Sequence, residues 1–432
     1  MFKNLLKYII ISIITLEARL VLFRYRPRII AISGTVGKTT TKDLVFQVLN
    51  SELKVRKTRK SLNSEIGIPL TILGHSTGWT SPLSWIKIIW SGFCQIIYTP
   101  NYPDWLVIET GIDRPGDMDR IAKMLKPEIV IITAFGAVPA HVEYFESPDD
   151  VMKEEAKLMN YIRENGSLIL NADDEDVLKL KSKSKVKTYT YGIKNDRADM
   201  LATNSNINYP GPSGISFKIN NEGNVIPITI NNVLGDQYIY PSMAALTAGK
   251  ILGISPATSA ESINKFVPAP GRMNLIKGKN KSIIIDDTYN ASPLAMHKAL
   301  ETFERINCEG YKIAILGDML EIGRFSHSEH EKVGAMVADF KIDFLITIGI
   351  RAEDIGKSAA THGMAKKKIF ILKDLDEATD VILDLLIKKE GSAVLAKGSQ
   401  GVRVEKLVRR IIDNPEKAGK LLVRQEKEWQ ER

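Results

Sequence analysis

Seven consecutive residues have the composition of a phosphate-binding loop: Gly34, Thr35, Val36, Gly37, Lys38, Thr39 and Thr40. They follow the apolar run Ile29–Ile32 and precede a helical pattern over 42–49, which predicts a strand, a loop and a helix in that order. Small residues let backbone N–H groups converge on phosphate oxygens at a helix N-terminus, while Lys38 neutralises phosphate charge and the Thr39 hydroxyl reaches Mg²⁺. The segment therefore predicts a nucleoside triphosphate site, although Ile32 stands where the common pattern has glycine.

A carboxylate and an imidazole follow two further apolar runs that are predicted as strands. Glu109 comes directly after Trp105–Ile108, so we expect it at the carboxyl edge of a core strand, where it can bind Mg²⁺ directly or through water. His141 lies in the loop after Ile129–Thr133. A lone histidine is more often structural than a ligand, and only the position of His141 beside the phosphate-loop strand makes it a candidate.

Three polar loops in the second half of the chain also follow predicted strands. They span 286–293, 317–323 and 397–401. Each loop by itself is consistent with ordinary turn chemistry. Three of them in one domain, after a phosphate-loop domain, predict a cleft that closes between two domains.

The elements that must position these residues form an α/β pattern. Short apolar strands alternate with helical segments, which predicts a mostly parallel, doubly wound sheet. Residues 185–232 alternate polar and apolar side chains, which predicts a small antiparallel sheet added to the first one. The Pro/Gly-rich stretch Val267–Arg272 marks a boundary, and a second, Rossmann-like α/β alternation follows it. We predict an N-terminal helix over 1–25, a central ATP-binding domain over 26–268, and a C-terminal domain over 269–432 that ends in a charged, solvated tail.

Charge and cysteine content exclude several protein classes. The formal net charge is +8, and residues 1–60 hold thirteen of the Lys and Arg residues against three Asp and Glu. Cys94 and Cys308 are far apart and have no metal-ligand spacing, which indicates a reducing, cytoplasmic compartment and no disulfide framework. The basic run Lys54–Lys60 has no aromatic platform or nucleic-acid motif beside it, so no nucleic-acid partner is expected.

Two apolar segments leave two interpretations open. In residues 1–25, the uncharged run Tyr8–Leu16 is too short to cross a bilayer and is followed by arginines. A second segment, Trp79–Tyr98, is rich in aromatic residues and has Lys87 as its only charge. Both fit helices at the inner face of a membrane, and both fit helices packed on their own domain.

Several motifs together resemble the Mur ligases, in particular the branch that joins D-alanyl-D-alanine to a UDP-linked muramoyl peptide. The resemblance covers about 29–412 and includes the phosphate loop without its first glycine. It rests further on these segments: 62–70, 109–111, 139–143, 286–293, 317–323 with His330, and 397–399.

The resemblance implies roles for individual residues. Catalytic roles fall to Lys38, Glu109, His141, Glu155 and Arg272, and Mg²⁺ would be held by Thr39, Glu109, His141 and Glu155. ATP would be bound by the phosphate loop, Asn63, Asp287 and Asn290. The amino substrate would meet Asp318, Glu321, Lys397 and Ser399. The implied substrates are ATP, a muramoyl peptide and D-Ala-D-Ala, and the implied state is a monomer.

Three departures from the family pattern qualify this expectation. The phosphate loop begins at residue 34, so we expect the family's N-terminal UDP-binding domain to be missing. The lysine that becomes carbamylated in the family is matched by Glu155, whose carboxylate can supply the same anionic oxygens; Lys157 is the alternative if the helix is shifted. The segment Gly235–Pro241 replaces two polar residues of a family motif.

The expected activity is ATP-dependent amide ligation through an acyl phosphate. Two alternatives remain open at this point. One is a ligase of the same mechanism with a different acid or amine. The other is a membrane-associated P-loop NTPase that uses domain closure as a switch.

Overall fold

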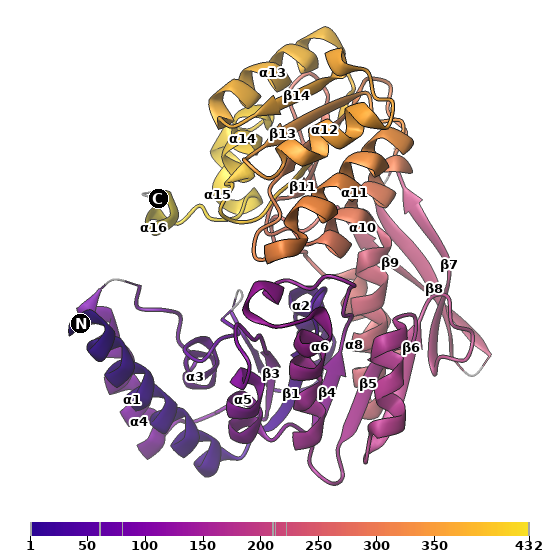
Figure 1. Ribbon diagram of the computed structural model, residues 1–432. Helices are drawn as coiled ribbons and strands as arrows, with labels where there is room; N and C mark the ends of the chain where they lie inside the picture. The colour runs from indigo at the N-terminus through magenta and orange to yellow at the C-terminus, as the bar shows by residue number, and fades with distance from the viewer. Residues whose placement is uncertain are drawn as a thin grey trace.

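The computed structural model describes residues 2–59, 62–79, 81–209, 211, 213–221 and 223–430. Lys60, at the end of the basic run, and Thr80, in the second apolar segment, lie outside these ranges. The chain forms two α/β units with separate sheets, one on either side of the Pro/Gly-rich stretch Val267–Arg272 (Figure 1). The α/β fold class predicted from the sequence is confirmed.

The first sheet has nine strands in the order β2-β3-β1-β4-β5-β6-β7-β8-β9. Their bounds are β1 Arg28–Ser33, β2 Val55–Lys57, β3 Trp105–Glu109, β4 Ile129–Ile132, β5 Ser167–Asn171, β6 Lys187–Gly192, β7 Met200–Asn208, β8 Gly214–Asn221 and β9 Asn224–Asn231. Strand β1 lies between β3 and β4 and pairs parallel with both. The chain runs from β1 to one side of the sheet and then to the other, so the crevice for a ligand opens beyond the end of β1.

The prediction of an antiparallel sheet over 185–232 is wrong for the first strand of this segment, β6. Strands β7, β8 and β9 pair antiparallel, but β6 pairs parallel with β5 and belongs to the main sheet. The reason is burial, because Thr190 and Tyr191 of β6 are covered while the later strands are half-exposed. The alternating pattern of the sequence does not reveal which strand joins the parallel part.

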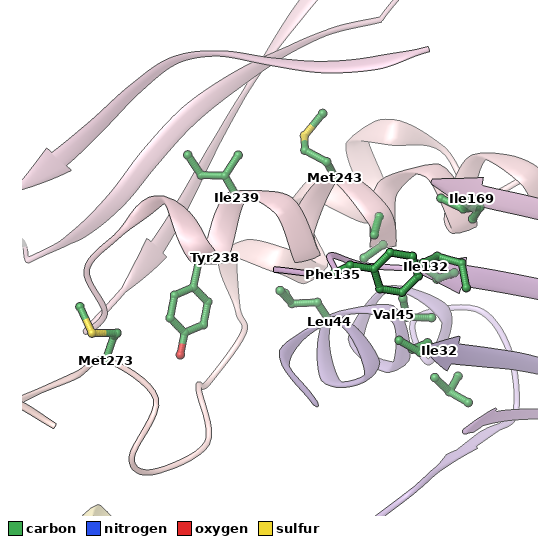
Figure 2. Close-up of a cluster of buried hydrophobic side chains, with 14 of the residues drawn as sticks. Ile32, Leu44, Val45, Ile132, Phe135, Ile169, Tyr238, Ile239, Met243 and Met273 are labelled. Carbon is green, nitrogen blue, oxygen red and sulfur yellow. The ribbon is translucent and has the colours of Figure 1, made fainter. Parts of the chain in front are cut away.

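Helices cover both faces of the first sheet. Their bounds are α1 Phe2–Tyr25, α2 Lys38–Leu49, α3 Gly67–Leu73, α4 Pro82–Ile97, α5 Asp117–Leu125, α6 Pro148–Ala156, α7 Glu175–Leu178, α8 Ile239–Ile251 and α9 Pro256–Asn264. Figure 2 shows the core beside the phosphate loop, where Leu44 and Val45 of α2 meet Ile132 of β4 and Met243 of α8. This packing fixes the helix whose N-terminus faces the crevice.

Helices α1 and α4 pack on each other at the outer edge of the first unit (Figure 1). One face of α1 is buried at Ile14, Ala18 and Val21, whereas Tyr8 and Phe23 point outward. The interpretation as packed helices is therefore correct for one face of α1 and leaves the other face unexplained. Within the described ranges, no helix combines the length and apolar content that a membrane span needs.

The second sheet has six strands in the order β10-β11-β15-β12-β13-β14. The bounds are β10 Asn274–Lys277, β11 Ile283–Asp287, β12 Lys312–Gly317, β13 Phe344–Ile348, β14 Ile369–Leu372 and β15 Ala393–Lys397. Its helices are α10 Pro293–Glu304, α11 Ser326–Asp339, α12 Glu353–Thr361, α13 Leu375–Lys388, α14 Val404–Ile411, α15 Ala418–Leu421 and α16 Lys427–Gln430. Strands β11, β15 and β12 are neighbours and parallel, so the three predicted polar loops leave the sheet side by side.

The expectation of a purely solvated tail is wrong. Leu422 is buried, and the Arg424 guanidinium contacts Glu405 of α14, which is fully buried. Arg424 also donates to the backbone oxygens of Thr288 and Tyr289 in the loop after β11. The tail therefore holds this loop in place.

Candidate active site

The phosphate loop connects β1 to α2 through two glycines with positive φ angles. Gly34 has a φ of 123° and Gly37 a φ of 87°. A Cβ atom on Gly34 would lie 2.3 Å from Thr133 Oγ1, so only glycine fits against the end of β4. The Thr133 hydroxyl in turn donates to the carbonyl oxygen of Val36 at 2.7 Å, which holds the loop closed against β4.

Glu155 of α6 contacts the first half of the phosphate loop. Its carboxylate accepts hydrogen bonds from the Ser33 hydroxyl and, at 3.3 Å, from the Gly34 backbone N–H, and it lies 3.3 Å from Lys38 Nζ. Glu155 is 2% exposed, so this charge is held out of water beside the lysine. Lys157, the alternative position, instead pairs with Asp119 and with the buried Glu154. Glu155 is therefore the residue of α6 that faces the loop.

Glu109 contacts the other half of the loop. Its Oε1 accepts hydrogen bonds at 3.1 Å from both the Thr39 hydroxyl and Asn63 Nδ2. Its Oε2 is buried, lies 3.5 Å from Lys42 Nζ, and has no hydrogen-bond partner among the described residues. A buried carboxylate oxygen with spare acceptor capacity beside the Thr39 hydroxyl fits the oxygen donor set that Mg²⁺ prefers.

His141 lies apart from these two carboxylates. It has a φ of 65°, and its Nδ1 is 3.2 Å from Glu321 Oε2 and 3.9 Å from Asp113 Oδ1. Across the part of the chain that the structure describes, no three His, Cys, Asp or Glu side chains converge as a metal site. The four predicted Mg²⁺ ligands are thus divided between the phosphate loop and a contact to the second unit.

Arg272 joins the second unit to the phosphate loop. Its Nη2 donates to the Thr39 hydroxyl at 3.0 Å, and its guanidinium carbon lies 4.0 Å from the centre of the Tyr289 ring. Its Nε is buried and has no hydrogen-bond partner within the described residues. A guanidinium with an unused donor beside the loop is well placed to meet a phosphate oxygen.

The loop after β11 is fixed by ionic contacts. Lys397 Nζ lies 2.5 Å from Asp287 Oδ2 and 3.0 Å from the Asn290 carbonyl oxygen. The Asn290 side chain is exposed. Burial raises the pKa of neighbouring Asp286 to about 7, against two hydrogen bonds from Thr288 that oppose the shift.

The other two predicted substrate loops also contain residues with structural contacts. The Asp318 carboxylate accepts from the backbone N–H groups of Arg351 and Ala352, and the Ser399 hydroxyl accepts from Leu320 N at 2.9 Å. Glu321 is the predicted substrate residue that reaches the first unit. A cavity of about 630 Å³ lies beside these loops, lined by Asp318 and by charged residues of both signs.

Several residues of the site were not predicted from the sequence. Lys42 lies one turn after Lys38 and contacts Glu109, a spacing that the sequence displays. The roles of Ser33, Thr133 and Arg424 depend on tertiary contacts, and no local pattern marks them.

Family models match most of the chain. The model described as "Mur ligase middle domain" matches residues 32–81 and 94–249, and the model described as "Mur ligase, glutamate ligase domain" matches residues 271–400. The chain belongs to the Mur ligase family. The family resemblance predicted from the motifs is confirmed.

Two relatives of this Mur ligase have the same protein name. The chain is 29% identical to the UDP-N-acetylmuramoyl-tripeptide–D-alanyl-D-alanine ligase of Bacillus subtilis and 25% identical to that of Escherichia coli, covering 90% of this chain in both and 76% and 77% of the relatives. The chain thus spans about three-quarters of their length. It is an ATP-dependent ligase of the Mur type.

Solved structures agree on the fold. A MurF structure from Acinetobacter baumannii superposes with a TM-score of 0.74 at 22% identity, covering 91% of this chain and 79% of that one. A MurF ligase from Thermotoga maritima in complex with ADP gives a TM-score of 0.74 at 24% identity, with coverages of 93% and 83%.

Proposed function

We propose that this Mur ligase joins D-alanyl-D-alanine to the terminal carboxylate of a UDP-linked muramoyl peptide at the expense of ATP, in peptidoglycan precursor synthesis. The names of its relatives in Bacillus subtilis and Escherichia coli support this choice of acid and amine. The observation that carries the proposal is the pair of hydrogen bonds made by the Thr39 hydroxyl. This hydroxyl donates to Glu109 of the first unit and accepts from Arg272 at the start of the second. A phosphoryl group held at this point is reached from both units.

The proposed reaction has two steps. A carboxylate oxygen of the acid attacks the γ-phosphorus of ATP, ADP leaves, and an acyl phosphate forms. The neutral amine of D-alanyl-D-alanine then attacks the acyl carbon, phosphate leaves with its electron pair, and the amine loses a proton. Lys38 and Arg272 oppose the charge that develops on the transferring phosphoryl group.

Mg²⁺ is the cation that we propose for the nucleotide, and the residues at the loop fit it. The Thr39 hydroxyl, the Oε2 oxygen of Glu109 and the carboxylate of Glu155 would hold it. When bound, Mg²⁺ neutralises charge on the β- and γ-phosphates. His141 and Glu321 we assign instead to the contact that closes the two units on each other.

We further propose that the enzyme works in the cytoplasm as a monomer. The use of ATP and the two free thiols, Cys94 and Cys308, support a reducing compartment. The charges and nucleotide loops needed for the reaction are all supplied by one chain, which supports a monomer.

The test is a product assay with the purified chain, ATP, Mg²⁺ and UDP-muramoyl tripeptide, with and without D-alanyl-D-alanine. We expect ADP release that depends on both the acid and the dipeptide, and a product whose mass equals their sum less one water. Lys38→Ala is the matched control and should release no ADP.

Two other outcomes of this assay would change the proposed substrate or the proposed reaction. ADP release with a different amine or muramoyl carrier would keep the mechanism and replace the substrate. ADP release that needs neither acid nor amine would contradict the ligase proposal and favour the NTPase switch.

A further inference from the structure

Exposed apolar side chains are concentrated on one surface, formed by α1 and α4. Of seventeen large apolar side chains exposed in the described part of the chain, eleven lie on these helices or on Tyr98, which ends α4. On α1 they include Tyr8, Leu16 and Phe23, whose spacing places them on one helix face. The members are Tyr8, Ile9, Leu16, Leu20, Phe23, Leu83, Ile86, Trp90, Phe93, Ile97 and Tyr98, and we call them the α1–α4 face.

The helices under this face form a rigid platform. The Glu17 carboxylate packs against the backbone of Gly92, where a Cβ would lie 2.2 Å from Glu17 Oε2. The Tyr25 hydroxyl donates to the Gln95 carbonyl oxygen at 2.8 Å, and Gln95 Nε2 donates to the carbonyl oxygen of Leu73 in α3. The outward side chains are therefore held in place by the domain body, so a loose helix end does not explain their exposure.

The exposed charged side chains on α1 and α4 themselves are of one sign. Lys7, Arg19, Arg24 and Lys87 are exposed on the two helices, and Glu17, their only described carboxylate, is buried between them. No ion pair joins Arg19 or Lys87 to a carboxylate within the described residues. An apolar face with cations on it is the composition of a helix that lies in the interface of an anionic membrane.

A basic pocket opens beside the C-terminal half of α1. It has a volume of about 340 Å³, and its lining includes Phe23 of the α1–α4 face and Arg19 of α1. Lys123, Lys126 and Arg163 supply three more cations, and none of its lining residues is acidic. A pocket with four cations and an apolar rim fits a phosphate group that carries an acyl chain.

We propose that the α1–α4 face docks on an anionic lipid bilayer and that the basic pocket takes a lipid phosphate. Neither helix crosses the bilayer, and α1 instead lies along it, with Leu16, Phe23 and Trp90 in the interface. A second copy of the chain is a poorer occupant, because a twofold contact would bring the same cations against each other. This inference does not depend on the ligase substrates.

The experiment is flotation of the full chain with vesicles of phosphatidylcholine alone or mixed with phosphatidylglycerol. We expect co-flotation with the mixed vesicles at ~0.1 M salt and weaker binding at ~0.5 M salt, where surface charges are screened. The variant Leu16→Glu/Trp90→Glu should lose binding by at least about tenfold. The matched control Val225→Glu/Ile387→Glu, which replaces two exposed apolar side chains elsewhere, should bind like the wild type.

A second variant tests the pocket. Replacing Arg19, Lys123 and Arg163 by glutamine should weaken binding to phosphatidylglycerol vesicles by about fivefold for each charge removed and leave the ATPase rate without vesicles unchanged. Equal flotation of the pocket variant and the wild type would overturn the assignment of the pocket.

Three results would overturn the docking proposal as a whole. The first is a wild-type chain that stays unbound on anionic vesicles. The second is a Leu16→Glu/Trp90→Glu variant that binds as well as the wild type. The third is a dimer in analytical ultracentrifugation that this variant converts to a monomer, because the face would then be covered by a second copy. Circular dichroism and thermal unfolding confirm that each variant is folded before it is compared.

Discussion

We propose that Glu155 stands where the resemblance to the family places a lysine that becomes carbamylated. Its carboxylate contacts the Ser33 hydroxyl, the Gly34 N–H and Lys38 Nζ without any chemical modification. We propose that this carboxylate supplies the anionic oxygens that the resemblance assigns to a carbamylated lysine. We infer that the enzyme works independently of bicarbonate.

Substitution of Glu155 should separate this role from that of Lys157. We expect Glu155→Gln to lower kcat by about 10²–10³-fold, because one fixed charge of the phosphoryl-transfer site is lost. Lys157→Ala, which removes the ion pairs with Asp119 and Glu154, should change kcat by less than about twofold. The measurement is steady-state ADP release with saturating substrates.

The complementary variant is Glu155→Lys. Activity that appears only when bicarbonate is added would show that a carbamate can replace the carboxylate. A Glu155→Ala enzyme with full activity would contradict the role of Glu155 altogether.

Asp286 gives a prediction about pH. Burial raises its pKa to about 7, so between pH ~4 and 7 the folded chain keeps a proton that the unfolded chain releases. The free energy of unfolding therefore falls as the pH rises through this window. We expect Asp286→Asn to remove this fall and to be the more stable protein at pH ~8, by at least about 1 kcal/mol.

Urea unfolding of both proteins at several pH values measures this effect. A variant that loses the same stability at every pH would show that the Asp286 carboxyl is not protonated in the fold.

At the scale of the elements, the loop after β11 depends on contacts from a distant segment. Arg403 Nε and Arg424 Nε lie 2.6 and 3.1 Å from Glu405 Oε1, and Arg424 holds the backbone of Thr288 and Tyr289. Glu405 is completely buried. The C-terminal segment therefore supports Tyr289, on which Arg272 stacks.

Removing the buried charge should be costly. We expect Glu405→Gln to lower the free energy of unfolding by about 3–5 kcal/mol, because Arg403 and Arg424 would keep buried charges without a carboxylate. Asp384→Asn, which breaks the exposed pair with Lys388, is the matched control and should cost less than about 1 kcal/mol. Equal losses in urea unfolding would contradict a special role of the buried cluster.

The elements themselves could be predicted largely from the sequence, and the exceptions have physical reasons. Mostly apolar runs such as Trp105–Ile108 and Phe344–Ile348 are strands in the structure because both sides of each run are covered. Strand β6 and the tail were predicted wrongly because their places depend on tertiary contacts, with β5 for the strand and with Glu405 for the tail. Local pattern carries no information about such partners.

At the scale of the whole molecule, the site is made where the two units meet. Arg272 reaches Thr39, His141 reaches Glu321, and Arg324 Nη2 donates to the Glu146 carbonyl oxygen at 3.0 Å. The cleft between two domains was predicted from three polar loops, but the sequence does not indicate that Lys397 and Ser399 have structural contacts inside it.

Removing the contact between Arg272 and Thr39 should therefore affect catalysis more than nucleotide binding. We expect Arg272→Ala to lower kcat by about 100-fold, because a charge is lost and the two units are held less closely, while the Kd for ATP rises by much less. Arg305→Ala breaks another bridge between the units, to Asp236 at the surface, and should leave kcat nearly unchanged. Equal effects of the two variants on kcat would show that general loosening, not contact with the phosphate loop, explains the loss.

The most direct test of the account follows an oxygen atom. The muramoyl peptide is labelled with ¹⁸O in its terminal carboxylate, the reaction is run with ATP and D-alanyl-D-alanine, and the inorganic phosphate is analysed by mass spectrometry. Phosphoryl transfer to the carboxylate predicts one ¹⁸O atom in each phosphate released along with the amide product. Phosphate whose new oxygen comes only from water would contradict ligation through an acyl phosphate.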